Sequence, residues 1–408
     1  MGFYLYRPFG TQLFWGVGNW LFGLNPFGYH VIYYLFFAAN TILVWVLCRT
    51  LKLSDRTAMI TTVLYAFSAA GFNRLYFLST FQETAMATFV LSTMILFHKK
   101  NPFSLATFIL ALTCKEIAIM TPAILFVQEW LLGNKKVLRL IPFTFVAGGY
   151  FLAHKFLYGF FSPEEYPDIK YVFNLRSVLN NYFWYFLWTL GVPEQFVNVY
   201  FFRLPTVINP QLFTNFGSFG AGIMFLAFGL AGLVLGAIIC ARKHLFEDIK
   251  LVLYSLTVFG LFLLPVVFFP FHKFASSLSL PTVGFVLILG FLLSKVNFKV
   301  CLLVTGVYLL LSWMTLVYNR QTHWNVTRAT LTAKIVSYFQ KNYPSGVKSY
   351  ENVYFVGGLS REAWLGLSGP YAFQLLYNDP NIKVYFEETD QRKNLTANSL
   401  VINSQMFK

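Results

Sequence analysis

Long apolar segments separated by short polar ones fill the first three quarters of the chain. This pattern predicts membrane helices over 29–48, 57–70, 82–97, 102–114, 116–132, 138–157, 216–240, 251–270, 274–293 and 300–318. Open backbone groups are not satisfied in lipid, and the short alternating strands of a β-barrel are not evident, so we expect an all-α bundle of about ten spans. Several segments are short. At about 1.5 Å per residue, 102–114 covers only about 20 Å, less than the roughly 30 Å of a bilayer core, which favours helices that end beneath a water-filled cavity.

Two aromatic segments do not fit the series of spans. The segment 178–202 is apolar but is interrupted by Pro193 and Glu194, and counting it as a span would reverse the orientation of the later loops. We therefore expect an interfacial or re-entrant helix there, with its Trp and Tyr residues at the headgroup level. The glycine-punctuated segment 10–24 has the same character.

The chain changes character after the last apolar segment. "NVYFVGG", "IKVYFEE" and "SLVINS" have the pattern of strands, and a segment with helical spacing lies between the first two. We predict two domains, a membrane domain over 1–318 and a small α/β domain over 319–408. A glycine fingerprint does not follow the first strand, so a nucleotide site is not expected.

Composition supports the membrane class. The chain is 57% hydrophobic and only 12% charged, whereas a soluble domain is about 25% charged. The net charge of +15 would indicate nucleic acid in a soluble protein, but here the basic residues are explained as orientation anchors, and no nucleic-acid partner is expected. The four cysteines lie in apolar segments without paired spacing, so a Cys/His metal site is not expected either.

Lysine and arginine in the loops predict the orientation. They are concentrated in one set of alternate loops, 49–56, 98–101, 133–139, 241–250 and 294–299. The positive-inside rule places this set in the cytoplasm and places the N-terminus and the domain 319–408 on the extracytoplasmic side. A multi-pass protein of a bacterial inner or plasma membrane is the expectation.

Ionisable residues at the opposite ends of the spans are the candidates for chemistry, because such residues are unfavourable in a membrane. They form four clusters in the sequence: Tyr6, Arg7 and His30; Arg74 and Glu83; Lys115 and Glu116; His272 and Lys273. Arginine binds phosphate through a two-pronged fork and lysine adds a point charge, so together they predict a site for a lipid phosphate or pyrophosphate headgroup.

The roles of these residues have alternatives. Glu83 or Glu116 could act as a general base or could hold the cations in place. Lys115 and Glu116 could instead pair with other residues, Arg74 could be an interface anchor, and His30 could be a satisfied hydrogen-bond donor.

Four segments, in order, resemble the GT-C superfamily of multispanning glycosyltransferases. They are "YRPFGTQLFWGVGNWLFGLNPFGYH", "LALTCKEIAIMTPAILFVQE", "HKFASSLSLPTVGFVLILG" and "YNRQTHWNVTRATLTAKIV". The chain is similar to bacterial relatives of the TMTC-type and protein O-mannosyltransferase families over roughly residues 4–340.

The resemblance implies a sugar donor linked to polyisoprenyl phosphate and a protein or glycan acceptor on the extracytoplasmic side. It implies that Arg7 lies near the active cavity, that Glu83 lies in the second outer loop and Lys115 and Glu116 at the third, and that Lys273 takes the place of a donor-phosphate contact where the family has arginine. Some members use a divalent metal ion; no residue is assigned to one. The family also has a first span and an acidic loop, which would precede residue 1. Two alternatives are an inactive remnant that binds lipid and a lipid or polysaccharide transporter, which should show repeats or broken helices.

Overall fold

The computed structural model describes residues 7–133, 135–158, 171–196, 217–390 and 394–408. These residues are mostly helical, which confirms the predicted helical class. The chain divides into two compact units, Met1–Val317 and Tyr318–Lys408, next to the boundary expected from the sequence.

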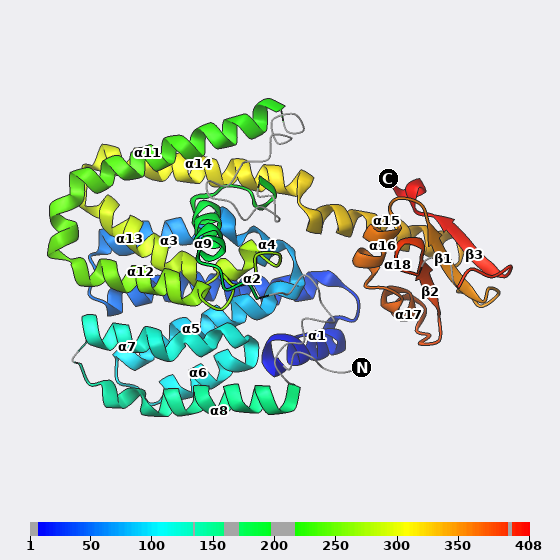
Figure 1. Cartoon of the computed structure of the whole chain (residues 1–408), viewed down its shortest axis with the longest axis horizontal. Helices are drawn as coiled ribbons and strands as arrows, with labels where there is room; N and C mark the ends of the chain where they lie inside the picture. The colour runs from blue at the N-terminus through cyan, green and yellow to red at the C-terminus, as the bar shows by residue number, and fades with distance from the viewer. Residues whose placement is uncertain (1–6, 134, 159–170, 197–216, 391–393) are drawn as a thin grey trace. The chain divides into compact units, whose positions relative to one another are not determined.

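The first unit is a bundle of helices (Figure 1). Its α-helices are α1 (Phe14–Phe22), α2 (Pro26–Thr50), α3 (Asp55–Ala66), α4 (Phe72–Tyr76), α5 (Phe81–His98), α6 (Phe103–Cys114), α7 (Thr121–Leu131), α8 (Ile141–Tyr158), α9 (Leu175–Leu190), α11 (Gly217–Glu247), α12 (Ile249–Leu263), α13 (Pro281–Lys295) and α14 (Phe298–Thr322). Short π- or 3-10 helices are η1 (Pro8–Leu13), η2 (Ala69–Gly71), η3 (Leu78–Thr80), η4 (Glu116–Met120), η5 (Val137–Leu140), η6 (Glu194–Phe196) and η7 (Ala275–Leu278).

Each predicted apolar segment coincides with a helix, but the length criterion selects fewer spans. Four helical stretches of the described residues are long and apolar enough to cross a bilayer: Pro26–Thr50, Val137–Leu157, Ser218–Glu247 and Phe298–Asn342. The others are shorter; α6 and α7, for example, meet at a break after Cys114. The four long helices support a bilayer environment, whereas the count of about ten spans stays a prediction.

Close approach of α13 to its neighbours depends on two glycines. A Cβ atom at Gly284 would lie 2.6 Å from the backbone nitrogen of Phe259 on α12, and one at Gly290 would lie 3.0 Å from the backbone nitrogen of Thr61 on α3. Only glycine allows backbones to pack at this distance. Helix α13 therefore lies in the core of the unit, between α12 and α3.

The five basic loops lie at one end of the first unit, which we call the basic end. Arg56 donates to the Val296 carbonyl at 3.1 Å, and Arg139 donates to the Phe97 carbonyl at 2.6 Å. Lys295 lies 3.8 Å from Asp248. These contacts connect loops that are far apart in the sequence, and Figure 1 shows the α7–α8 and α11–α12 connections at the same side of the bundle. The side of the membrane that this end faces stays a prediction.

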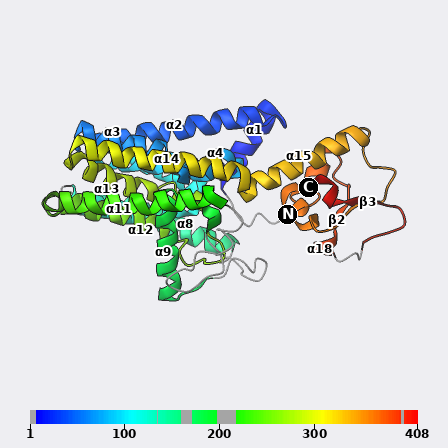
Figure 2. The same ribbon diagram turned by 90° about the horizontal axis from the view of Figure 1, so that it is seen from above.

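Helix α9 runs across the bundle. It is seen almost end-on in Figure 1 and lengthwise in Figure 2. The Asn174 side chain caps its first turn, and Gly191 in the left-handed region ends it, two residues before Pro193. The helix predicted over 178–202 thus begins earlier and ends earlier, while 197–202 lie outside the described residues. Its interfacial or re-entrant position, and that of 10–24, stays a prediction.

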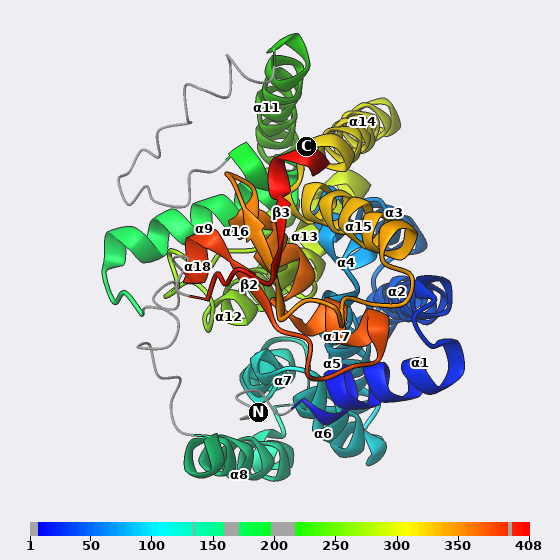
Figure 3. The same cartoon turned by 90° about the vertical axis from the view of Figure 1, so that its right-hand side faces the viewer.

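The second unit is a small α/β fold with a parallel sheet. It contains α15 (Trp324–Asn342), β1 (Asn352–Val356), α16 (Ser360–Leu367), α17 (Tyr371–Tyr377), β2 (Val384–Phe386), α18 (Glu387–Asp390), β3 (Ser399–Asn403) and η8 (Ser404–Phe407). The three strands are ordered β2-β1-β3, and Val353 pairs with both Val384 and Leu400. Figure 3 shows β2 and β3 with the helices of this unit. The three predicted strands are confirmed.

Candidate functional site

The site begins at the break between α6 and α7. Helix α6 ends at Cys114, and Lys115 has an extended backbone, with φ −159° and ψ 141°. A short 3-10 helix then starts at Glu116 and leads into α7, which has Pro122 in its first turn. Successive side chains of an extended backbone point in opposite directions. Lys115 and Glu116 therefore reach different partners.

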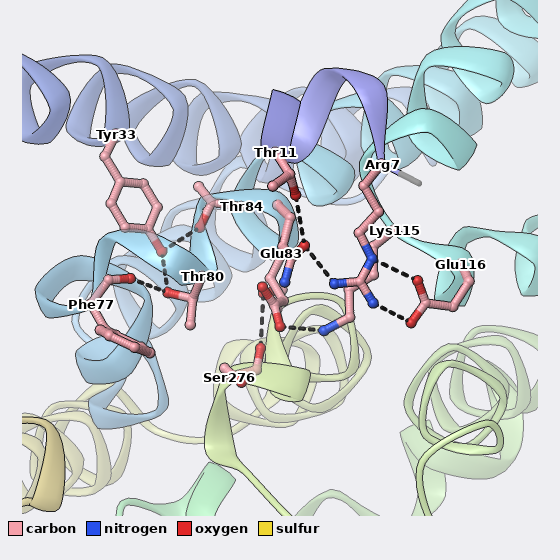
Figure 4. Close-up of polar contacts among 12 residues, drawn as sticks. Arg7, Thr11, Tyr33, Phe77, Thr80, Glu83, Thr84, Lys115, Glu116 and Ser276 are labelled. Carbon is pink, nitrogen blue, oxygen red and sulfur yellow. Dashed lines mark hydrogen bonds and ion pairs between the residues drawn. The ribbon is translucent and has the colours of Figure 1, made fainter. Parts of the chain in front are cut away.

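Arg7 and Glu116 form a two-pronged ion pair (Figure 4). Arg7 Nε donates to Glu116 Oε2 at 2.9 Å, and Nη2 donates to Oε1 at 2.6 Å. The third nitrogen, Nη1, donates to Gln82 Oε1 at 2.6 Å, and the Thr11 hydroxyl approaches the same oxygen at 3.4 Å. The Arg7 side chain is 11% exposed and that of Glu116 is 30% exposed. The guanidinium is thus held on both sides by acceptors.

Lys115 and Glu83 form the second pair. The Lys115 ammonium contacts Oε1 of Glu83, and both side chains are buried. Glu83 lies in the first turn of α5, where the positive end of the helix dipole favours a carboxylate. Two cations and two carboxylates therefore balance within one network (Figure 4).

The two ion pairs bear out one alternative that the sequence left open, whereas the role of either carboxylate as a general base stays a prediction. Lys115 and Glu116 do pair with other residues, as the alternative interpretation held. The edge of Arg7 that could bind a phosphate in a two-pronged manner is occupied by Glu116. In the described structure, Arg7 and Lys115 are neutralised cations, and Glu83 and Glu116 are the groups that neutralise them.

Lys273 differs from the other cations of the site. It lies in the loop between α12 and α13, is only 5% exposed, and makes no ion pair with any residue that the structure describes. Burial lowers the pKa of its ammonium group from 10.5 to about 8. A buried lysine without a carboxylate is unfavourable, and an anionic ligand would relieve this.

The loop that carries Lys273 reaches the ion-pair network. Ser276, three positions further on, lies beside Glu83 in Figure 4. The backbone nitrogen of Ala275 donates to Glu194 Oε2 at 2.8 Å, which ties the loop to the segment after α9. We call the set Arg7, Gln82, Glu83, Lys115 and Glu116 the polar cluster, and Lys273 lies in the loop that reaches it.

Of the four remaining predicted residues, the structure describes the side chains of His272 and His30. His272 is exposed, and its ring meets that of Phe274 edge-on, with centroids 4.6 Å apart. His30 lies on α2 and stacks on Tyr34 at 5.9 Å, and the described contacts do not join it to the ion pairs. Arg74 belongs to α4, but its side chain lies outside the described residues, as does Tyr6. The phosphate-binding roles of all four stay predictions.

Sequence reasoning missed two side chains that hold the cluster together. Gln82 bridges Arg7 and Thr11, and Glu194 accepts from the Lys273 loop. Gln82 is next to Glu83 in an otherwise apolar helix, which was a usable signal. Glu194 was visible only as an interruption of an aromatic segment.

Metal ligands are not brought together in the described part of the chain. Groups of three or more His, Cys, Asp or Glu side chains do not occur there, and both carboxylates of the cluster are ion-paired. Scans against protein-family models, curated proteins and solved structures found no match to the chain.

Proposed function

We propose that the chain is a GT-C-type membrane glycosyltransferase scaffold that binds a polyisoprenyl-phosphate-linked sugar at the polar cluster and transfers the sugar to a protein or glycan acceptor on the extracytoplasmic side. The observation that carries the proposal is Lys273, a buried ammonium group without a carboxylate partner among the described residues, in a loop whose Ser276 lies beside Glu83 of the Lys115–Glu83 pair. The phosphate of the donor would supply the missing negative charge.

The chemistry requires stabilisation of the leaving phosphate. When the bond from the sugar to the phosphate oxygen breaks, the negative charge on that oxygen grows, and a fixed cation nearby lowers the barrier. Lys273 is suited to this task because its ammonium is already removed from water, so its attraction to an anion is weakly screened. Arg7 is less suited, because its fork is occupied by Glu116.

The two carboxylates take different roles in the proposal. Both oxygens of Glu116 are bound to Arg7, so Glu116 is a positioning residue. Glu83 contacts Lys115 through one oxygen, Oε1, and the other oxygen faces Ser276 in Figure 4. Glu83 is therefore the better candidate for accepting the proton of the acceptor hydroxyl.

One observation favours a second function. Both carboxylates of the cluster are engaged in ion pairs, which suits a protein that binds a lipid phosphate without reacting it. A turnover measurement separates the two functions.

The test is transfer by the purified full-length chain. A polyprenyl-phosphate-linked sugar with a radiolabelled sugar is added, and the release of free polyprenyl phosphate is followed. An enzyme should release it, and Glu83→Gln should abolish release while the variant still binds the donor. Donor binding without release would leave the lipid-binding function. A chain that does not bind the donor at all would contradict both.

A further inference from the structure

A polar cavity of about 190 Å³ lies at the basic end of the first unit. It is far larger than the roughly 15 Å³ that one water needs on the same measure. Its lining comes from the α2–α3, α5–α6 and α7–α8 connections: Leu51, Lys52, His98, Lys100, Glu129, Leu132, Gly133 and Arg139. This cavity is separate from the polar cluster, because the connections that form it are at the other ends of α5, α6 and α7.

The charges around the cavity are unbalanced. Three cations, Lys52, Lys100 and Arg139, face one carboxylate, Glu129. Arg139 lies 3.6 Å from Glu129 and donates to the Phe97 carbonyl at 2.6 Å. Lys52 and Lys100 form neither an ion pair nor a side-chain hydrogen bond with any residue in the described ranges. Two ammonium groups at the cavity are therefore available to a ligand.

The backbone at these two lysines is unusual. Lys52 has φ +60° and Lys100 has φ +59°, in the left-handed region that residues with a Cβ atom rarely adopt. Each follows the end of a helix in the same hydrogen-bonded motif. Lys52 N bonds to Arg49 O and the next nitrogen to Cys48 O, while Lys100 N bonds to Phe97 O and the next nitrogen to Leu96 O.

Glycine is the usual residue at this position of the motif. Helix dipoles and membrane orientation explain why lysines are frequent near the ends of α2 and α5. A third lysine, Lys135, also has a left-handed backbone (φ +59°) but does not line the cavity, so the backbone alone does not mark a site. Lys52 and Lys100 differ from it because both side chains line the same cavity, and a requirement for their ammonium groups there explains why lysine rather than glycine occupies these two positions.

We propose that this cavity binds a phosphate group through Lys52, Lys100 and Arg139, either that of an anionic lipid headgroup or that of a free phosphate ion. Basic pockets between membrane helices bind anionic headgroups on the side that carries the positive loops. Phosphate supplies several acceptor oxygens, which matches two ammonium groups and a guanidinium at one cavity. The site does not depend on the proposed glycosyl transfer.

The test uses full-length protein in detergent with two probes, inorganic phosphate and a short-chain phosphatidylglycerol. Binding is measured as the rise in the midpoint of thermal unfolding with probe concentration. The decisive variant is Lys52→Gly/Lys100→Gly, which removes both ammonium groups and also relieves the left-handed strain, so it should fold as well as the wild type. We expect its affinity for the effective probe to fall about 100-fold, roughly tenfold for each lysine.

A matched control removes two charges at the same end but outside the cavity, Lys99→Gln/Lys299→Gln. It should keep the wild-type affinity. Stronger binding of phosphatidylglycerol than of phosphate would identify a lipid headgroup site, and equal binding would identify a free-phosphate site. The proposal is overturned if neither probe stabilises the wild type, or if the double glycine variant binds as tightly as the control.

Discussion

Two nitrogens of the Arg7 guanidinium donate hydrogen bonds to the Glu116 carboxylate, at 2.9 and 2.6 Å, although the two residues are 109 positions apart in the chain. The contact joins η1, at the start of the described chain, to the break between α6 and α7. It therefore holds η1 against the end of α6.

Loss of Arg7 should destabilise the first unit. Arg7→Met leaves Glu116 without its partner, and we expect the free energy of unfolding to fall by about 2–4 kcal/mol, because one partner of a largely buried pair is removed. The double variant Arg7→Met/Glu116→Gln should recover part of this loss. Chemical denaturation in detergent measures both. The exposed pair Arg49–Asp55 is the control, and Asp55→Asn should change stability by less than about 1 kcal/mol.

The Lys115–Glu83 pair should behave as a coupled unit. Glu83→Gln leaves the Lys115 ammonium buried without a charge partner, and Lys115→Met leaves Glu83 in the same state. Each single variant should lose about 3 kcal/mol of stability, and the double variant should lose less than the sum of the two. Additive losses in a double-mutant cycle would show that the two side chains do not interact.

Helix α13 should tolerate no side chain at Gly284. A Cβ there would lie 2.6 Å from the backbone nitrogen of Phe259, so the backbones of α12 and α13 would have to move apart. Gly284→Ala should lower the free energy of unfolding by about 1–3 kcal/mol. Gly229 on α11 has no atom within 4 Å of such a Cβ, so Gly229→Ala should leave stability unchanged or raise it by up to about 1 kcal/mol. Equal effects of the two changes would argue against the α12–α13 packing.

Binding of an anionic lipid phosphate at Lys273 should weaken above pH 8. Burial lowers the pKa of this ammonium to about 8, so the free protein loses the proton as pH rises through that value. Below pH 8 the lysine is charged and affinity should be constant. Above it, binding must also take up a proton, so affinity should fall up to tenfold per pH unit. A binding titration across this range checks the prediction, and Lys273→Arg should bind independently of pH up to at least 10, because arginine stays protonated.

The helices of the first unit were predictable from hydropathy, whereas several of their ends were not. The segment expected to begin at 274 starts its helix only at Pro281, because Phe274 is extended and a 3-10 turn follows it. The connection before it is apolar, so hydropathy cannot distinguish it from the helices that flank it. The number of spans and their orientation depend on where the bilayer lies along the helices. Neither the sequence pattern nor the helix lengths give that position.

The charged residues of the polar cluster were predictable, but Gln82 and the pairing of the charges were not. Arg7, Lys115 and Lys273 were identified as functional candidates because each lies at the end of an apolar segment. Nothing in the sequence couples Arg7 to Glu116 rather than to Glu83, because that choice depends on the extended backbone at Lys115. Nor could the sequence show that Arg7 and Lys115 have carboxylate partners whereas Lys273 has none among the described residues.

The most direct test of the proposed function is the affinity of a short-chain polyprenyl phosphate for the wild type, Lys273→Met and Lys273→Arg at pH 7. Lys273→Met should bind about 10- to 100-fold more weakly, because one charge-assisted contact is lost, while Lys273→Arg should bind within about tenfold of the wild type. Equal affinity of the wild type and Lys273→Met would contradict the assignment of the donor phosphate to this lysine.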